Sequence, residues 1–317
     1  MRIITVGPLP PEWGGPRPGG VATSHRLVLE GLRKDHDVAV ITWTQSDEVD
    51  VLRPNKSDPE SWYEEQAAKA DVVLMFHVSH PWAIYHARRK PTPAVGSVRS
   101  WSPVLEDPGK RTATIEGISG MEVLVFPTSH SRTQGQELGF SYPVPTLIVR
   151  NALASVFVEE NFDLDQQRRG VVFAGSSSVP IKRLEVAEEA CRRLGVDLRV
   201  ISGRPQGDVR SAMLSAEALC VPSSSEATGN VYIEAAACGT PSVGYGPAIN
   251  EISRDAGLSI GESADPDTVE ALRRVLGAQW DRHAMRAGVV TNYTMENTLA
   301  GYEDAFAVAI ARYKAQQ

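Results

Sequence analysis

The sequence has few cysteines, no long apolar run and no excess of positive charge. Its three cysteines, Cys191, Cys220 and Cys238, are scattered in apolar surroundings, which is typical of buried thiols in a reducing compartment. No stretch approaches the roughly 18 consecutive apolar residues of a membrane span, and the N-terminus reads as a strand and not as a signal peptide. A net charge of −7 gives no general attraction to nucleic acid or anionic lipid. We therefore expect a cytoplasmic protein with no transmembrane segment and no bulk nucleic-acid binding.

What the sequence does contain is a regular alternation of short apolar runs and helical patterns. In the first half, strands are expected at residues 2–7, 37–42, 71–76, 94–98, 122–126 and 146–149, with helices at 21–33 and 129–138. After a polar joint near residues 159–169, strands are expected at 170–175, 196–201, 218–221 and 242–244, with helices at 182–194, 207–215, 265–276, 281–287 and 294–314. This alternation predicts an α/β protein with doubly wound, mostly parallel sheets, whose ligands bind at the C-terminal strand ends.

The most specific motif is a pair of glutamates, Glu226 and Glu234, eight positions apart. The apolar run 218–221 leads into a polar loop that contains Glu226, and a helix is expected to open near Gly229 and Asn230. Glu234 then lies about one and a half turns into this helix. The N–H groups at the helix start, around residues 229–231, suit a phosphate because they are unpaired and lie at the positive end of the dipole. The alternative is an ordinary strand–helix unit with two solvated glutamates.

This run resembles the Glu-x7-Glu signature of retaining GT-B glycosyltransferases, a large family that includes bacterial mannosyl- and glucosyltransferases and sucrose synthases. The positions that fit the family pattern are Pro222, Ser223, Glu226, Gly229, Glu234, Ala235, Ala237, Gly239 and Pro241. The sequence departs from it at Ala227 and Thr228, where Gly-Phe is commoner, and at Asn230, where Leu is usual.

The resemblance implies a GT-B fold, in which two Rossmann-like, doubly wound domains face a cleft. Residues 1–163 would form the N-terminal, acceptor-side domain, and residues 164–293 the C-terminal, nucleotide-sugar-binding domain. The terminal helix, within residues 294–317, would cross back to the N-terminal domain.

The resemblance also implies a diphosphate clamp after strand 170–175. Relatives carry an arginine and a lysine there; Lys182 matches the lysine, whereas Ser176 occupies the arginine position. Arg183 follows where glycine is usual and offers a second positive charge. Gly203 matches a strand end where the base often lies. The alternative is a serine cluster beside a solvated Lys-Arg pair at a helix start.

In the N-terminal half, a loop with Gly19 and Gly20 resembles the family's Gly-Gly-Val entry to the first helix, and it fits a dinucleotide-binding fingerprint poorly. Trp13 in this loop is either a flexible cover for the ligand or a loop anchor. His77, at the end of strand 71–76, is expected to face the donor sugar, with His80 as its competitor because the run is about one residue longer than in relatives. A metal pair formed by these two histidines lacks a third ligand, and a histidine without chemistry remains another alternative.

The activity implied is retaining transfer of a hexose from a nucleoside-diphosphate sugar, with a UDP-sugar favoured, to an acceptor hydroxyl. Glu226, His77 and Lys182 would be catalytic, and Glu226 would hold the sugar hydroxyls. The donor would also contact Gly19, Gly20, Ser176, Arg183, Gly203, Gly229, Asn230, Val231 and Glu234, the last holding the ribose. No metal or cofactor is expected besides the nucleotide sugar. The acceptor is open: a glycan, lipid carrier, natural product or modified nucleobase. The alternatives are a nucleotide-sugar epimerase or hydrolase of the same fold, and a catalytically silent nucleotide-sugar-binding protein.

Overall fold

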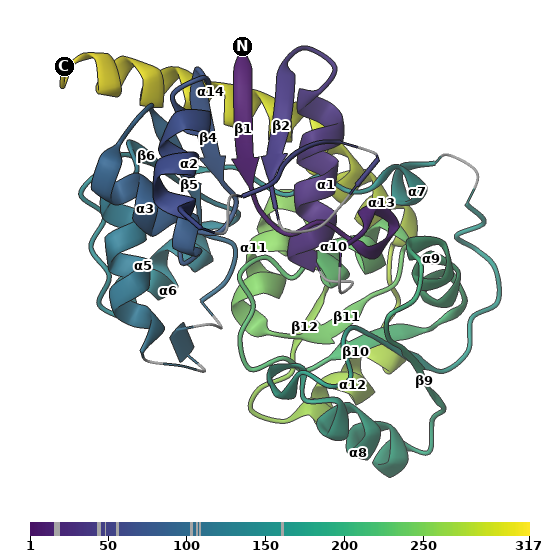
Figure 1. Ribbon diagram of the computed structural model, residues 1–317. Helices are drawn as coiled ribbons and strands as arrows, with labels where there is room; N and C mark the ends of the chain where they lie inside the picture. Colours follow the sequence, from purple (N-terminus) through teal and green to yellow (C-terminus); the bar gives the residue numbers. More distant parts are fainter. Residues whose placement is uncertain are drawn as a thin grey trace. The chain divides into compact units, whose positions relative to one another are not determined.

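The strands of the protein form two separate parallel sheets (Figure 1). The structure is a computed structural model, and it describes residues 1–317 except 16–19, 43–45, 48, 55–56, 102–103, 106, 108 and 160–161. Within the described residues, no helix has the length and apolar character needed to cross a membrane.

The first sheet has seven strands in the order β3-β2-β1-β4-β5-β6-β7. Their bounds are β1 Arg2–Val6, β2 Asp37–Ile41, β3 Asp50–Leu52, β4 Val72–Met75, β5 Ala94–Ser97, β6 Val123–Phe126 and β7 Thr146–Ile148. All pairings are parallel, and β1 pairs with both β2 and β4, so the strand order reverses there. Ligands of open α/β sheets bind at the C-terminal strand ends beside such a reversal.

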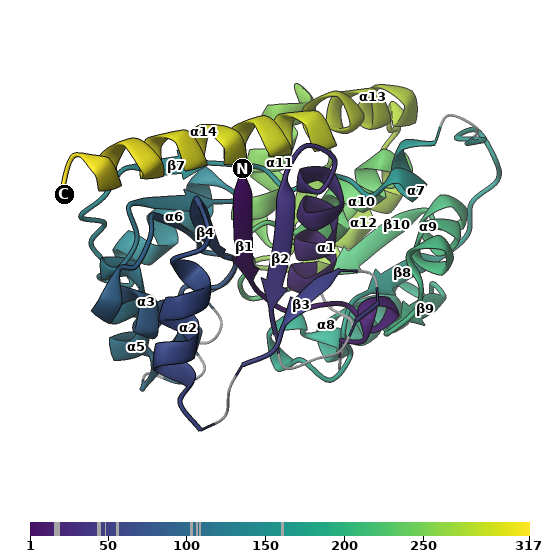
Figure 2. The ribbon, with the colours of Figure 1, turned by 45° about the horizontal axis from the view of Figure 1, so that its top comes forward.

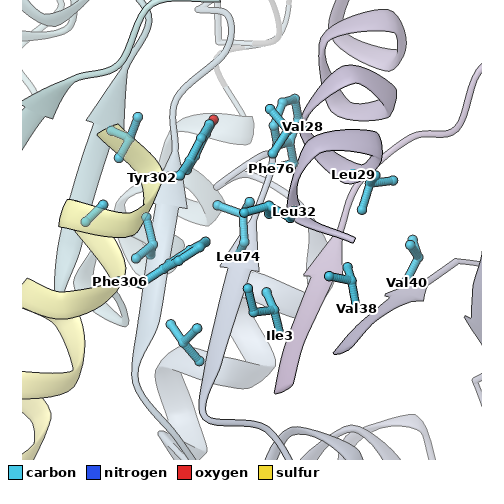
Figure 3. Packing of buried hydrophobic residues seen from close by; sticks show 14 of the residues in the cluster. Ile3, Val28, Leu29, Leu32, Val38, Val40, Leu74, Phe76, Tyr302 and Phe306 are labelled. Carbon is cyan, nitrogen blue, oxygen red and sulfur yellow. The ribbon is translucent and has the colours of Figure 1, made fainter. Parts of the chain in front are cut away.

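Alternate residues of these strands face two different hydrophobic cores, as the two-residue period of a strand requires. One core contains Ile3, Leu74 and Val125 and is covered by α1 (Gly20–Leu32) and α14 (Met295–Lys314) (Figure 3). The strand residues next to these, such as Ile4 and Met75, face the second core. The helices α2 (Pro59–Ala67), α3 (Pro81–Arg89) and α5 (Lys110–Ser119) contribute to that core. Both faces of the sheet are therefore buried, which explains the continuous apolar runs in its strands.

The second sheet has five parallel strands in the order β12-β11-β10-β8-β9. Its strands are β8 Val171–Ala174, β9 Leu198–Ile201, β10 Ala218–Val221, β11 Ser242–Gly244 and β12 Gly261–Ser263. The helices of this part are α7 Ser155–Val158, α8 Leu184–Leu194, α9 Gln206–Ser215, α10 Asn230–Ala237, α11 Gly246–Ala256, α12 Thr268–Gly277 and α13 Arg282–Asn292. Since β8 pairs with both β10 and β9, the strand order reverses at β8.

The chain divides into two compact units, one made of Met1–Ala152 with Met295–Gln317 and the other of Leu153–Thr294. Helix α14 belongs to the first unit, where it packs against β4, β5, β6 and β7 (Figure 2). The division comes earlier in the chain than the joint expected at 163/164. The reason is that Arg286 of α13 donates hydrogen bonds to the carbonyl oxygens of Phe157 and Val158, at 2.8 and 3.0 Å, which ties α7 to the second unit.

Several elements differ from the sequence-based expectation. The helices α2, α3, α5 and α11 and the strands β3 and β12 were not expected from the sequence pattern. The helix expected at 182–194 begins at Leu184, because Arg183 has a left-handed backbone with φ 53°. The helix expected at 265–276 begins at Thr268, because the Asp267 side chain accepts from the amides of Val269 and Glu270 and so caps it.

Candidate functional site

Glu226 lies in the loop at the C-terminal end of β10, and two donors converge on its carboxylate. The Ser223 hydroxyl donates to Oε1 of Glu226 at 2.7 Å, and the Lys182 ammonium pairs with the same oxygen. The Glu226 and Lys182 side chains are 13% and 24% exposed, so the pair is shielded but reachable from solvent. Both of these contacts are made by Oε1 of Glu226.

The loop ends at Gly229, which precedes the first turn of α10. Gly229 has φ 72° and, as the N-cap, contributes no side-chain hydrogen bond to that turn. Its left-handed backbone favours glycine. Asn230 and Val231 begin the helix, at the positive end of its dipole. The C-terminal ends of β8 and β10 and the start of α10 thus bring a lysine, a carboxylate and a helix N-terminus together.

Glu234 is half-buried on α10, one turn beyond Asn230. Burial raises the pKa of its carboxyl group to about 8, and the nearby positive charge of Lys182 opposes this rise. Glu234 therefore holds its proton at neutral pH and can both donate to and accept from a ligand hydroxyl. Glu226 and Glu234, which the sequence analysis paired, both lie close to Lys182.

Three arginines hold the other end of α10. Arg168, Arg282 and Arg286 donate to the carbonyl oxygens of Cys238, Gly239 and Ala237, at 2.9, 2.5 and 2.6 Å. These carbonyls have no partner within the helix, and cations also interact favourably with the negative end of its dipole. No local sequence pattern reveals this arginine clasp, because its members come from the segment before β8 and from α13.

The other residues expected to bind the donor beside Lys182 lie in the loops that follow β8 and β9. Ser176 is exposed in the loop after β8, and its hydroxyl lies 3.2 Å from that of Ser178. Arg183 directly follows Lys182 and pairs with Asp265 at 3.3 Å. Gly203 follows β9, is exposed and has φ 63°. Lys182 is therefore the cation of this loop that reaches Glu226, whereas Arg183 is directed to Asp265.

In the first unit, His77 follows β4 and lies at the C-terminal edge of its sheet. Burial lowers the pKa of His77 to about 4, with smaller contributions from His80 and Lys110, so the imidazole is neutral at pH 7. Its Nδ1 is 2.8 Å from the hydroxyl of Ser79. His80 has a different role, because its Nδ1 accepts from the Trp82 amide at 3.3 Å and caps α3. Of the two competing histidines, His77 is the one whose ring is not used as a helix cap.

The Gly-rich loop of the first unit is described only in part. Gly19 lies outside the described residues, and Gly20 is exposed at the first position of α1. Trp13 is 8% exposed and belongs to the core beneath α1 and α14, so it anchors the loop.

A buried polar cluster at the same edge was not found from the sequence. Arg99 is 5% exposed; its guanidinium donates to Asn151 and Tyr302 and lies 4.2 Å from the centre of the Phe76 ring. Burial lowers the pKa of Arg99 to about 9. His25 is also buried; its Nδ1 donates to the carbonyl oxygen of Pro8 at 2.9 Å, and its Nε2 lies 3.2 Å from the Thr5 hydroxyl. Arg99 and Tyr302 alone are separated by 203 positions, so no local sequence pattern could reveal this cluster.

Within the described ranges, no group of three or more His, Cys, Asp or Glu side chains is arranged to hold a metal ion. The expectation that catalysis needs no metal stays a prediction.

Comparison with known proteins identifies the second unit. Residues 151–278, which carry Lys182, Glu226 and Glu234, match the family model of "glycosyl transferases group 1". They form a group 1 glycosyl transferase domain. Glu226 and Glu234 lie within this matched segment, which confirms the resemblance to glycosyltransferases; the retaining mechanism stays a prediction.

Curated relatives match part of the chain. A D-inositol 3-phosphate glycosyltransferase from Kribbella flavida is 30% identical over 175 residues, covering 51% of this chain and 40% of the relative. One from Rhodococcus erythropolis is 31% identical over 161 residues, covering 46% of this chain and 35% of the relative. The match thus spans less than half the length of these relatives.

Solved structures extend the likeness to nearly the whole chain. The Anabaena protein Alr3699/HepE, in complex with UDP and glucose, has a TM-score of 0.74 at 13% identity, over 97% of this chain and 99% of its own. At this identity the likeness establishes the fold alone. The two parallel α/β sheets and this neighbour show that the chain has the GT-B fold expected from the sequence.

Proposed function

We propose that the protein is a retaining hexosyltransferase that uses a nucleoside-diphosphate sugar, with UDP as the favoured nucleotide. The observation that carries this proposal is the convergence of Lys182 and Ser223 on Glu226 at the start of α10. The Lys182 ammonium and the N-terminus of α10 suit a diphosphate, and the neighbouring Glu226 carboxylate suits the hydroxyls of the attached sugar. The group 1 glycosyl transferase domain that contains them gives this chemistry its context.

In this proposal, Lys182 moves from Glu226 to the diphosphate when the donor binds. Negative charge develops on the leaving phosphate as the anomeric bond breaks, and preorganised donors at that point lower the barrier. Lys182 and the amides around Gly229–Val231 would stabilise this charge. Glu226, released from its ion pair, would accept from sugar hydroxyls and keep its hydrogen bond from Ser223.

The other donor contacts follow from the same placement. Arg183 would compensate for Ser176, which occupies the family's arginine position, by leaving Asp265 for the diphosphate. Glu234, which is protonated at neutral pH, would hold the ribose hydroxyls. Gly203, exposed after β9, would leave room for the base. From the first unit, the neutral imidazole of His77 would hydrogen-bond a sugar hydroxyl, and Gly20 would approach the donor through its backbone.

UDP is favoured because the structural neighbour Alr3699/HepE was solved with UDP and glucose. The acceptor is proposed only as a hydroxyl compound, because the matched relatives, which are named D-inositol 3-phosphate glycosyltransferases, align over less than half their length.

The test is a transfer assay with UDP-, GDP-, dTDP- and ADP-hexoses and a panel of hydroxyl acceptors. Transfer is monitored through the nucleoside diphosphate released, and the configuration of the product is determined by NMR of its anomeric proton. We expect transfer from one nucleotide class with the anomeric configuration of the donor preserved, and activity unchanged by EDTA. Inversion would refute the retaining mechanism. Hydrolysis or epimerisation without transfer would support the alternative enzyme class, and binding without turnover would support a silent binding protein.

A further inference from the structure

Tyr232 is on α10 between the two glutamates, but its side chain is directed into the protein. The residue is 0% exposed. Its hydroxyl donates to the carbonyl oxygen of Val221 at 2.7 Å and accepts from the amide of Tyr245 at 3.0 Å. Val221 is the last residue of β10, and Tyr245 directly follows β11. One phenol therefore joins two strand ends to the helix that carries Glu234.

Two glycines make room for this ring. A Cβ atom at Gly229 would lie 2.4 Å from the Tyr232 ring, and a Cβ atom at Gly244 would also lie 2.4 Å from it. Real Cβ atoms do not approach other atoms this closely, so both positions require glycine as long as the ring stays in place. Gly229 also ends the loop that carries Glu226. The Tyr232 ring therefore packs directly against the glycine at which the Glu226 loop ends.

The phenol also lies next to the hydrogen bonds of Glu226. Burial raises the pKa of Tyr232 well above its ordinary value; the Glu226 carboxylate adds to the rise, and the Ser223 hydroxyl opposes it, so both groups are close to the phenol. Ser223 in turn donates to Glu226 at 2.7 Å. The phenol holds the strand end at Val221, and the loop with Ser223 and Glu226 begins at the next residue.

We propose that Tyr232 is a positioning residue for Glu226: its hydroxyl fixes the ends of β10 and β11, and thereby holds the Glu226 carboxylate where the donor sugar binds. This inference rests on the proposed nucleotide-sugar function. A side chain that is fully buried, and so cannot contact the sugar, would thereby contribute to sugar recognition. Tyr232 itself touches no substrate in this account.

The test compares Tyr232→Phe, which removes only the hydroxyl, with Tyr63→Phe. Tyr63 is equally buried, and its hydroxyl has a side-chain partner, Nδ1 of His86 at 2.8 Å, in the first unit. We expect Tyr232→Phe to lower kcat by roughly 10- to 100-fold, since small misplacements of catalytic groups have effects of this size. Tyr63→Phe should leave kcat unchanged, although both variants lose one buried hydroxyl.

A double-mutant cycle separates positioning from general loss of structure. In a Glu226→Gln background, Tyr232→Phe should have almost no further effect on kcat, because the group it positions is already impaired. Equal losses in both backgrounds, or no loss in either, would overturn the proposal.

Calorimetry gives a readout that does not need turnover. Tyr232→Phe should weaken binding of UDP-glucose about 10-fold more than binding of UDP, because Glu226 contacts only the sugar. Equal weakening of both ligands would overturn the positioning role while leaving the proposed function intact. If the unmodified protein binds neither these ligands nor their GDP, dTDP and ADP counterparts, the proposed function fails, and the positioning role fails with it.

Discussion

Replacement of Glu234 by glutamine should stabilise the protein at high pH and have little effect at low pH. Glu234 is half-buried on α10, and its desolvation raises its pKa to about 8 in the folded chain. Because the folded pKa lies above the unfolded one, the neutral acid stabilises the fold fully below the unfolded pKa of about 4.5, and this stabilisation is lost as the pH rises through 8. Glutamine has nearly the same shape and stays neutral throughout.

The size of the effect follows from the two pKa values. One pKa unit corresponds to about 1.4 kcal/mol, so a rise from 4.5 to about 8 gives an upper limit of roughly 5 kcal/mol for the cost of ionising Glu234 in the folded protein. The side chain keeps some contact with solvent, which screens the charge. We therefore expect Glu234→Gln to raise the free energy of unfolding at pH 9 by about 2–4 kcal/mol, and to change it by less than about 0.5 kcal/mol at pH 4.5.

The assay is urea unfolding followed by far-UV circular dichroism at pH 4.5, 7 and 9. Tryptophan fluorescence is less suitable, because Trp280 is the only tryptophan between residues 153 and 294. Glu188→Gln, at an exposed position of α8, is the matched control and should give the same curves as the unmodified protein. If Glu234→Gln changed stability equally at all three pH values, or destabilised the protein at pH 9, the account of a buried neutral carboxyl group would be wrong.

Three further substitutions test neighbouring parts of the site. Gly229→Ala places a Cβ atom 2.4 Å from the Tyr232 ring at a residue with φ 72°. It should therefore lower the free energy of unfolding by about 1–3 kcal/mol. An unchanged midpoint of thermal unfolding would contradict the close packing of Gly229 against the ring. Arg286→Met removes hydrogen bonds to several carbonyl groups and should cost about 2–4 kcal/mol, whereas Arg274→Met, at an exposed position, should cost less than about 0.5 kcal/mol. Lys182→Met should weaken nucleoside-diphosphate binding at least ~10-fold in calorimetry, and unchanged binding would remove Lys182 from the diphosphate site.

The site in the second unit could be placed from the sequence because its signals are local. A buried strand, a polar loop and a glycine before a helix fix the positions of Glu226 and Glu234 along the chain. The sequence could not show that Lys182 meets Glu226, since 44 residues separate them and the contact depends on β8 and β10 pairing.

The helices that the sequence did not predict also have weak or ambiguous local signals. Helix α11 begins with Gly246 and Pro247, which indicate a turn when read locally, but proline is also tolerated in the first turn of a helix. Helix α2 is mostly polar and buries only Tyr63 and Ala67, so its apolar periodicity is weak. The arginine clasp was missed because a sequence does not reveal which arginines are buried against helix carbonyls.

In the proposed function, Lys182, Glu226 and the start of α10 bind a nucleoside-diphosphate sugar. The most direct measurement is thermal unfolding with UDP, GDP, dTDP, ADP and NAD at one millimolar-range concentration, repeated with Lys182→Met. A ligand present at 100 times its dissociation constant stabilises by about 2.7 kcal/mol. We expect one nucleoside diphosphate, with UDP as the first candidate, to raise the unfolding temperature clearly, and to raise it much less in the variant. A shift with NAD alone, or the same shift in the variant, would contradict this proposal.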